Sequence, residues 1–190
     1  METSEHTFLF ADLVGYTALT DSEGDDQAAA VALRFQDCAR RLAAEHGVED
    51  MKPLGDAVML RCPQAGGAIQ LGLRLLDAVE GDESLPPVRI GIHFGSAVGR
   101  EGDWFGRGVN VAARLCSAAG GGEVLVSEPA LTAAGELPRV EVGERRLHWL
   151  KNVTEPVPAR PASPRPRPRL RQRWARRCPR AHSGLAAKIA

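Results

Sequence analysis

Cysteine is scarce in this sequence, and long apolar runs are missing. The four cysteines are far apart and form no C-x-x-C pair, which argues against both a disulfide framework and a zinc site. They are Cys38, Cys62, Cys116 and Cys178. No stretch approaches the roughly 20 apolar residues of a membrane-spanning helix, and the first residues, METSEHT, lack the basic and apolar regions of a signal peptide. We therefore expect a cytoplasmic protein without a membrane span.

Two frequent catalytic patterns are also missing. The sequence contains no G-x-x-x-x-G-K phosphate-binding loop, which excludes a P-loop enzyme. No Ser-His-Asp or Cys-His arrangement that would activate a nucleophile is visible either. His93 could serve as a base, but it lies between Ile92 and Phe94 in a predicted strand. There we favour a structural histidine with a satisfied hydrogen bond.

Acidic residues are absent from the last part of the chain. Residues 160–190 contain ten Lys or Arg and no Asp or Glu, whereas residues 1–159 contain 14 basic and 24 acidic residues. The Arg- and Pro-rich composition from Pro161 onward cannot build a core and predicts disorder. We favour a solvated extension over an arm that touches nucleic acid or an acidic membrane. The chain is thus divided into a domain of residues 1–159 and a basic tail of residues 160–190.

The rest of the sequence has the periodicity of a folded domain, with 44% hydrophobic and 25% charged residues. The predicted helices span residues 25–46, 68–79, 109–118 and 129–134. The predicted strands span residues 8–10, 88–94 and 123–127, and β-hairpins are expected over residues 48–61 and 139–157. Strands and helices alternate, but one hairpin joins adjacent strands. The predicted fold is therefore α+β, a mixed and mostly antiparallel sheet with helices packed on it.

The stretch of residues 8–20 places a carboxylate at the end of a strand. Residues 8–10 form a buried strand, and Gly15 marks the turn before a helical pattern. Asp12 therefore lies near the carboxyl end of that strand, where an ion removed from water needs a cationic partner. It is either a metal ligand or an aspartate that caps the following turn, and this segment alone favours the cap.

A second carboxylate reverses that weighting. Asp56 lies at the tip of the predicted hairpin, within MKPLGDAVM, and a tight turn can bring it beside Asp12. Two carboxylates without a histidine nearby in the sequence suit Mg²⁺ or Mn²⁺ rather than zinc. Metals held by carboxylates and phosphates are typical of phosphoryl chemistry.

Asn110 and Arg114 are four residues apart in the predicted helix 109–118, which presents them on one face. Taken alone, a helix cap and an ordinary surface arginine explain these two residues.

Four segments, in this order, resemble the catalytic domain of the class III nucleotidyl cyclases, the adenylate and guanylate cyclase family. They are FADLVGYTALT, KPLGDAVM, VRIGIHFG and DWFGRGVNVAARL. The likeness covers roughly residues 7–158. Each segment alone is weak evidence for the family, but four segments in register are specific evidence. It implies a ferredoxin-like, palm-type core. The family's final strand, expected after Glu155, is predicted to be cut short at Pro158 by the Arg-Pro tail.

The resemblance implies roles for a set of site residues. The metal ligands are Asp12, Asp56 and the backbone carbonyl of Leu13, for two Mg²⁺ or Mn²⁺ ions per site. The substrate-binding residues are Gly15, Tyr16 and Thr17 at the triphosphate, Arg89 and Lys151 as cations beside the phosphates, and Lys52 with Asp103 at the base. The catalytic residues are Asn110 and Arg114, which orient the ribose and stabilise the transition state.

The chemistry of the base favours ATP over GTP. Lysine only donates hydrogen bonds and ionised aspartate only accepts them, which matches the acceptor N1 and the donor amino group of adenine. Guanine reverses this pattern, and each buried mismatch costs about 1–3 kcal/mol.

The resemblance also implies a reaction and an assembly. The ribose 3′-hydroxyl attacks the α-phosphate and gives 3′,5′-cyclic AMP and pyrophosphate, with one ion lowering the pKa of the hydroxyl and the other neutralising the triphosphate. The metal aspartates of one subunit face the base-reading and catalytic residues of another, so a homodimer holds two equivalent sites. The alternatives are a guanylate cyclase and a catalytically silent nucleotide-binding or dimerising module. Nucleic acid is not expected as a partner.

Overall fold

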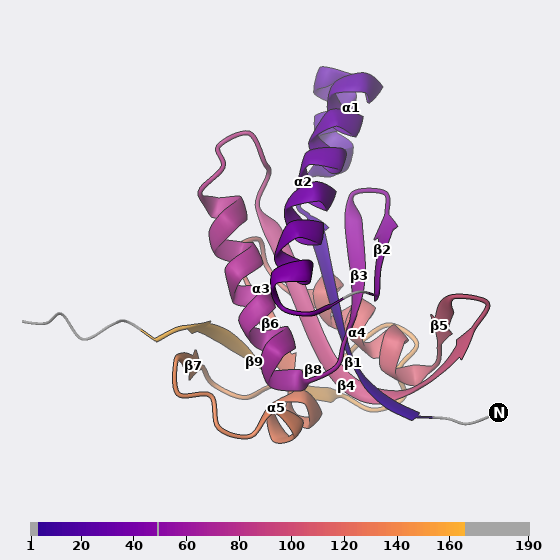
Figure 1. Ribbon diagram of the computed structural model, residues 1–190, viewed down its shortest axis with the longest axis vertical. Coiled ribbons are helices and arrows are strands. Elements are labelled where there is room, and N and C mark those ends of the chain that lie inside the picture. The colour runs from indigo at the N-terminus through magenta and orange to yellow at the C-terminus, as the bar shows by residue number, and fades with distance from the viewer. Residues whose placement is uncertain (1–3, 49, 166–190) are drawn as a thin grey trace, which may run out of the picture.

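The computed structural model describes residues 4–48 and 50–165. This part of the protein is built on one sheet (Figure 1). The strands are β1 (Ser4–Leu13), β2 (Asp50–Leu54), β3 (Ala57–Cys62), β4 (Val88–Arg100), β5 (Asp103–Phe105), β6 (Val124–Ser127), β7 (Val140–Val142), β8 (Arg146–His148) and β9 (Val157–Pro164). The helices are α1 (Tyr16–Glu23), α2 (Asp25–Glu45), α3 (Ala65–Glu80), α4 (Arg107–Ala118) and α5 (Glu128–Ala134). In this described part, no helix has the length and apolar character that crossing a bilayer requires.

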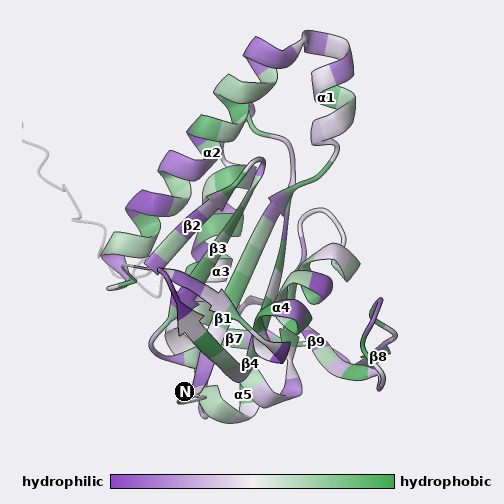
Figure 2. Cartoon of the chain, turned by 90° about the vertical axis from the view of Figure 1, so that its right-hand side faces the viewer, coloured by the Kyte–Doolittle hydropathy of each residue, from purple (hydrophilic) through white to green (hydrophobic). Residues whose placement is uncertain are grey.

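The strand order is β2-β3-β1-β4-β6-β9-β7, with β5 paired to β4 and β8 paired to β9. β4 and β6 run parallel, and the other pairs run antiparallel. The helices pack on both faces, and Figure 2 shows α2 and α4 on opposite sides of the sheet. This arrangement confirms the predicted α+β fold with a mixed, mostly antiparallel sheet.

β1 lies inside the sheet, and its side chains alternate between two buried layers. Leu9, Ala11 and Leu13 pack with residues of α2 and α3. Phe8 and Phe10 pack on the other face with residues of α4. Burial on both faces explains why this strand reads as a continuous apolar run. By the same alternation, Asp12 belongs to the α4 side of the sheet.

α4 lies directly against β4 because glycines leave room for its backbone. A Cβ on Gly91 would overlap the backbone nitrogen of Cys116 and come within 2.7 Å of the Ala112 carbonyl oxygen. A Cβ on Gly108 would lie 2.9 Å from the carbonyl carbon of Gly95. Side chains at these positions would push the helix away from the sheet. The glycines therefore fix the position of the helix that carries Asn110 and Arg114.

The carboxyl-terminal strands differ from the prediction. The expected hairpin over residues 139–157 is wrong, because β7 and β8 both pair with β9 rather than with each other. β9 also passes Pro158 and the predicted domain boundary at residue 159, and it reaches Pro164 while pairing with β6. Proline cannot donate to a ladder, but the carbonyl of Pro161 accepts a hydrogen bond from the Gly143 N–H at 2.8 Å. The remaining tail, residues 166–190, lies outside the described residues.

Candidate active site

Asp12 and Asp56 come together where β1 ends beside the β2–β3 turn. Asp12 pairs in register with Ala57, and the Leu13 N–H donates to the Asp56 carbonyl over 3.3 Å. Both carboxylates are partly buried. Burial raises the pKa of Asp56 above its usual value, and the negative charge of Asp12 adds to this effect. The two acidic groups therefore share one environment, as the hairpin reading predicted.

The donor atoms at this place fit a hard divalent cation. They are two carboxylates and the main-chain oxygens of neighbouring residues, a set that suits Mg²⁺ or Mn²⁺. Across residues 4–48 and 50–165, no three His, Cys, Asp or Glu side chains form a group that could hold a metal. Further ligands would have to be main-chain oxygens, water or the phosphates of a substrate.

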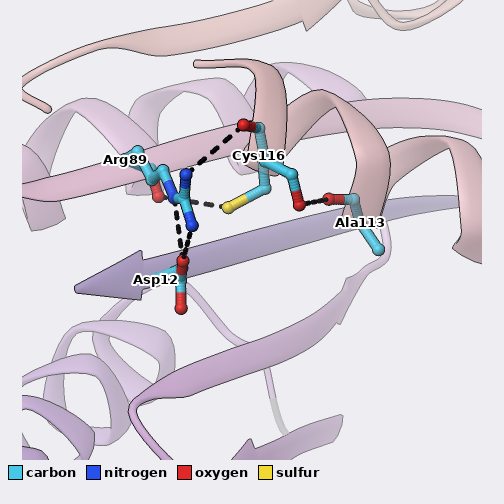
Figure 3. A network of polar contacts seen from close by, with 5 residues as sticks. Asp12, Arg89, Ala113 and Cys116 are labelled. Atoms are coloured by element: carbon cyan, nitrogen blue, oxygen red, sulfur yellow. Dashed lines mark hydrogen bonds and ion pairs between the residues drawn. The ribbon is translucent and has the colours of Figure 1, made fainter. Parts of the chain in front are cut away.

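Arg89 is the cationic partner of Asp12. The two residues pair in register across β1 and β4, and Nε and Nη2 of Arg89 both donate to Oδ2 of Asp12, at 2.8 and 2.5 Å (Figure 3). Nη1 of Arg89 also donates to the Ser117 carbonyl at 3.3 Å, near the end of α4. The guanidinium thus links Asp12 to the helix that carries Asn110 and Arg114. The sequence predicted the need for a cation beside Asp12 but not its identity.

Lys52 and Asp103 form an ion pair although they are far apart in the sequence. The Lys52 ammonium on β2 donates to Oδ2 of Asp103 at the start of β5. Oδ1 of Asp103 accepts the Trp104 N–H at 2.8 Å. The hydrogen bond from Lys52 and then that from Trp104 lower the pKa of Asp103. The aspartate is therefore an acceptor at neutral pH, as the base-reading hypothesis requires.

Asn110 and Arg114 lie on the exposed face of α4, whereas Val111, Ala112 and Leu115 are buried. The predicted helix and the shared face are therefore present. Among the described residues, neither side chain forms a hydrogen bond or ion pair with Asp12 or its neighbours. Within one chain, Asn110 and Arg114 thus face outward.

The other predicted site residues occupy two turns. Gly15 has φ 82° and ψ 14°, a left-handed conformation that favours glycine, and α1 begins at Tyr16 without a side-chain cap. The backbone N–H groups of Tyr16 and Thr17 thus lie in the first turn of a helix. Lys151 is exposed in the turn between β8 and β9.

His93 has a structural role, as predicted. Its side chain is buried, and Nδ1 lies 2.8 Å from Oγ of Ser127. Burial, and then the positive charge of Arg107, lower the pKa of His93 to about 4. The ring is therefore neutral at physiological pH.

Comparison with known proteins assigns the family. A sequence model of the adenylate and guanylate cyclase catalytic domain matches residues 1–147. The chain belongs to this cyclase family. The segments that hold Asp12, Lys52, Asp56, Asp103, Asn110 and Arg114 all lie within the matched residues, whereas Lys151 and β9 lie beyond them.

Curated relatives of this cyclase-family chain include adenylate cyclases. A pH-sensitive adenylate cyclase of Mycobacterium tuberculosis is 38% identical over 151 residues, which cover 76% of this chain and 38% of the relative. An adenylate cyclase of Streptomyces griseus is 39% identical over 135 residues, which cover 70% of this chain and 34% of the relative. The chain thus spans little more than a third of the length of these relatives. The solved guanylyl cyclase Cya2 shares the fold, with a TM-score of 0.76, 23% identity and coverage of 89% and 96% of the two chains.

Two features of this cyclase-family site were not visible in the sequence. The pairing of Asp12 with Arg89 depends on the register of strands 77 positions apart. Asp50 and Arg61 lie around Trp104, next to Lys52 and Asp103. The only signal was the spacing of Asp50 and Lys52, which places both on one face of a strand.

Proposed function

We propose that the chain is an adenylate cyclase domain, which converts ATP to 3′,5′-cyclic AMP and pyrophosphate. The observation that carries this proposal is the Lys52–Asp103 ion pair. It joins the Lys52 ammonium, which only donates hydrogen bonds, to the Asp103 carboxylate, which only accepts them. This pair of groups is the complement of the adenine edge. The adenylate cyclase names of the relatives support the same substrate. The shared fold does not distinguish ATP from GTP, since Cya2 is a guanylyl cyclase.

The carboxylates Asp12 and Asp56 and the carbonyl of Leu13 would hold divalent ions. Such ions, when bound, acidify the attacking hydroxyl and neutralise the triphosphate. Arg89 would keep the Asp12 side chain oriented and present a guanidinium to the phosphates. The N–H groups of Tyr16 and Thr17, at the start of α1, would bind phosphate oxygens.

The reaction would be an in-line displacement within one ATP molecule. The 3′ oxygen forms a bond to the α-phosphorus, the bond from that phosphorus to the bridging oxygen breaks, and pyrophosphate leaves while the hydroxyl proton passes to water. Asn110 would orient the ribose, and Arg114 would stabilise the charge that develops on the α-phosphate. Loss of one such donor typically reduces the rate by about 10² to 10³.

Two copies of the chain would share each active site. The outward position of Asn110 and Arg114 supports this, because these side chains must reach a nucleotide held by Asp12 and Asp56. A twofold dimer brings the α4 face of each subunit to the metal end of the other and creates two equivalent sites.

The first experiment supplies purified protein with Mn²⁺ and either ATP or GTP and identifies the product by mass. We expect 3′,5′-cyclic AMP from ATP and far less cyclic GMP from GTP. Equal or greater production of cyclic GMP would overturn the assigned substrate, and no cyclic nucleotide from either would indicate a silent module.

The second experiment tests the shared site. Asp12→Ala and Arg114→Ala should each be inactive alone, and mixing them should restore activity, because one of the two sites in a mixed dimer is intact. Arg41→Ala, on the exposed surface of α2, is the control and should retain full activity. Failure of the mixture to recover, when both variants dimerise, would contradict the shared site.

A further inference from the structure

Trp104 lies at the centre of a polar and aromatic cluster beside the base-reading pair. Its indole Nε1 donates to Oδ2 of Asp50 at 2.6 Å, and Nε of Arg61 donates to the same oxygen at 2.8 Å. The Arg61 guanidinium carbon lies 4.9 Å from the centre of the Trp104 ring. The rings of His6 and Phe8 contact the indole at centroid distances of 4.4 and 6.1 Å. The indole is therefore held by a hydrogen bond, a cation and two rings.

The cluster connects two strands that the backbone does not join. β5 is three residues long and pairs with β4, whereas β2 pairs with β3 and is the edge strand at one end of the sheet. Asp50 and Lys52 lie on one face of β2, and Asp103 and Trp104 are neighbours in β5. Two side-chain links thus run in parallel from β2 to β5. They are Lys52 to Asp103 and Asp50 to Trp104.

The Lys52–Asp103 link is an anchor only while no nucleotide is bound. Its side chains are 42% and 31% exposed, and ion pairs of this exposure contribute little to holding their partners in place. Moreover, both groups must turn to the base when a nucleotide binds. The Asp50–Trp104 link is a charge-assisted hydrogen bond on a packed ring, and neither of its groups is assigned to the base. It can therefore persist when the ion pair opens.

We propose that Asp50 is a positioning residue for base selection, which holds β5 through the Trp104 indole and so fixes Asp103 opposite Lys52. This inference rests on the proposed function. A pair that reads donor and acceptor positions discriminates only when its spacing is fixed, because a loose pair adapts to either purine. Arg61 holds the Asp50 carboxylate toward the indole, and the main-chain N–H of Trp104 holds Asp103.

The test compares kcat/KM for ATP and GTP, with Mn²⁺, in variants of this cluster. Asp50→Ala and Trp104→Phe each remove the hydrogen bond, and Trp104→Phe keeps an aromatic ring. We expect the ATP-to-GTP ratio to fall about tenfold in each, chiefly through a higher KM for ATP. The double variant should be no worse than either single one, because both remove the same link. Asp50→Asn, which keeps an oxygen acceptor for the indole, should restore most of the ratio.

A purely structural role predicts a different pattern. In that case both variants would lose activity with ATP and GTP equally, and the unchanged ratio would overturn the proposal. Asp77→Ala, an exposed carboxylate on α3, is the matched control and should leave the ratio unchanged. If Asp50→Ala does not fold, Trp104→Phe still decides between the two outcomes, because only the proposal expects this variant to lower the ATP-to-GTP ratio.

Lys52→Ala and Asp103→Ala, measured alongside, separate this inference from the proposed function. If they lower the ratio and the Asp50 and Trp104 variants do not, positioning by Asp50 is wrong and base selection by the ion pair stands. If none of the variants changes the ratio, positioning by Asp50 and base selection by the Lys52–Asp103 pair are both wrong.

Discussion

The two ends of the candidate site are built in different ways. At the metal end, Asp12, Asp56 and Arg89 are placed by the backbone ladders of β1, β3 and β4, which lie side by side in the sheet. At the base end, Lys52 and Asp103 are brought together by side chains that reach from β2 to the short β5. Ladders hold many residues at once, whereas a side-chain link depends on a few atoms. We therefore expect substitutions at the metal end to abolish catalysis and those at the base end to change selectivity.

The largest effect is expected for Asp12→Ala. The substitution removes a proposed metal ligand, and the cyclase rate should fall by about 10³ or more with both nucleotides. The ATP-to-GTP ratio should stay the same where residual turnover can be measured. Assays with both nucleotides and a urea unfolding curve, which checks that the fold is intact, test this. A changed ratio would contradict the expectation that only the base end determines selectivity.

Arg89→Ala should have the next largest effect. It removes two hydrogen bonds to the Asp12 carboxylate and the bond to the Ser117 carbonyl, so kcat/KM should fall by about 10². Arg89→Lys keeps the charge but cannot form the fork of two bonds, and it should recover only part of the rate. Full recovery with lysine would show that charge alone matters at this position.

Lys52→Ala should act on selectivity rather than on the chemical step. Removal of the proposed donor to N1 of adenine should lower the ATP-to-GTP ratio by about 10- to 100-fold, since one mismatched buried group costs about 1–3 kcal/mol. The maximal rate with saturating ATP should change much less. Steady-state kinetics with both nucleotides measures this, and a collapse of the maximal rate at an unchanged ratio would contradict it.

The sequence predicted the elements that depend on local patterns. The Gly-Asp turn, the helical periodicity of residues 25–46 and the apolar run of residues 8–10 correspond to the β2–β3 hairpin, α2 and the middle of β1. Contacts between distant segments were not predictable, because no local pattern specifies which strands pair. Examples of such contacts are the ion pair of Arg89 with Asp12, the Asp50–Trp104 hydrogen bond and the pairing of β9 with β6, β7 and β8.

Acid should destabilise the fold through His93, which is buried on β4. The folded protein holds the pKa of His93 at about 4, whereas the unfolded chain has the ordinary value of 6.5. Below pH 6.5 the unfolded chain binds a proton that the folded protein does not, so stability is lost as the pH falls from 6.5 toward 4. The loss from this residue amounts to about 3 kcal/mol. Urea unfolding at a series of pH values should show that the free energy of unfolding depends less on pH in His93→Gln than in the natural protein.

The smallest effect is expected for Gly91→Ala, which tests how closely α4 must lie. One methyl group would collide with the backbone of α4 and lower the free energy of unfolding by about 1–3 kcal/mol. Gly67→Ala in α3, where nothing lies within 4 Å of the added atom, is the control. It should be neutral or slightly stabilising. Equal stability of the two variants would show that α4 can shift without cost.

The strand β9 also determines where the chain tolerates truncation. Cutting after residue 159 would leave β6, whose residues Val124–Ser127 are all buried, with unpaired backbone groups along the side that β9 now covers. An apolar strand left open in this way is a template for aggregation. A chain that ends after Arg165, whose N–H donates to the Arg139 carbonyl at 2.9 Å, would keep β9 paired with β6. Removal of the remaining basic residues from that point should leave a soluble protein.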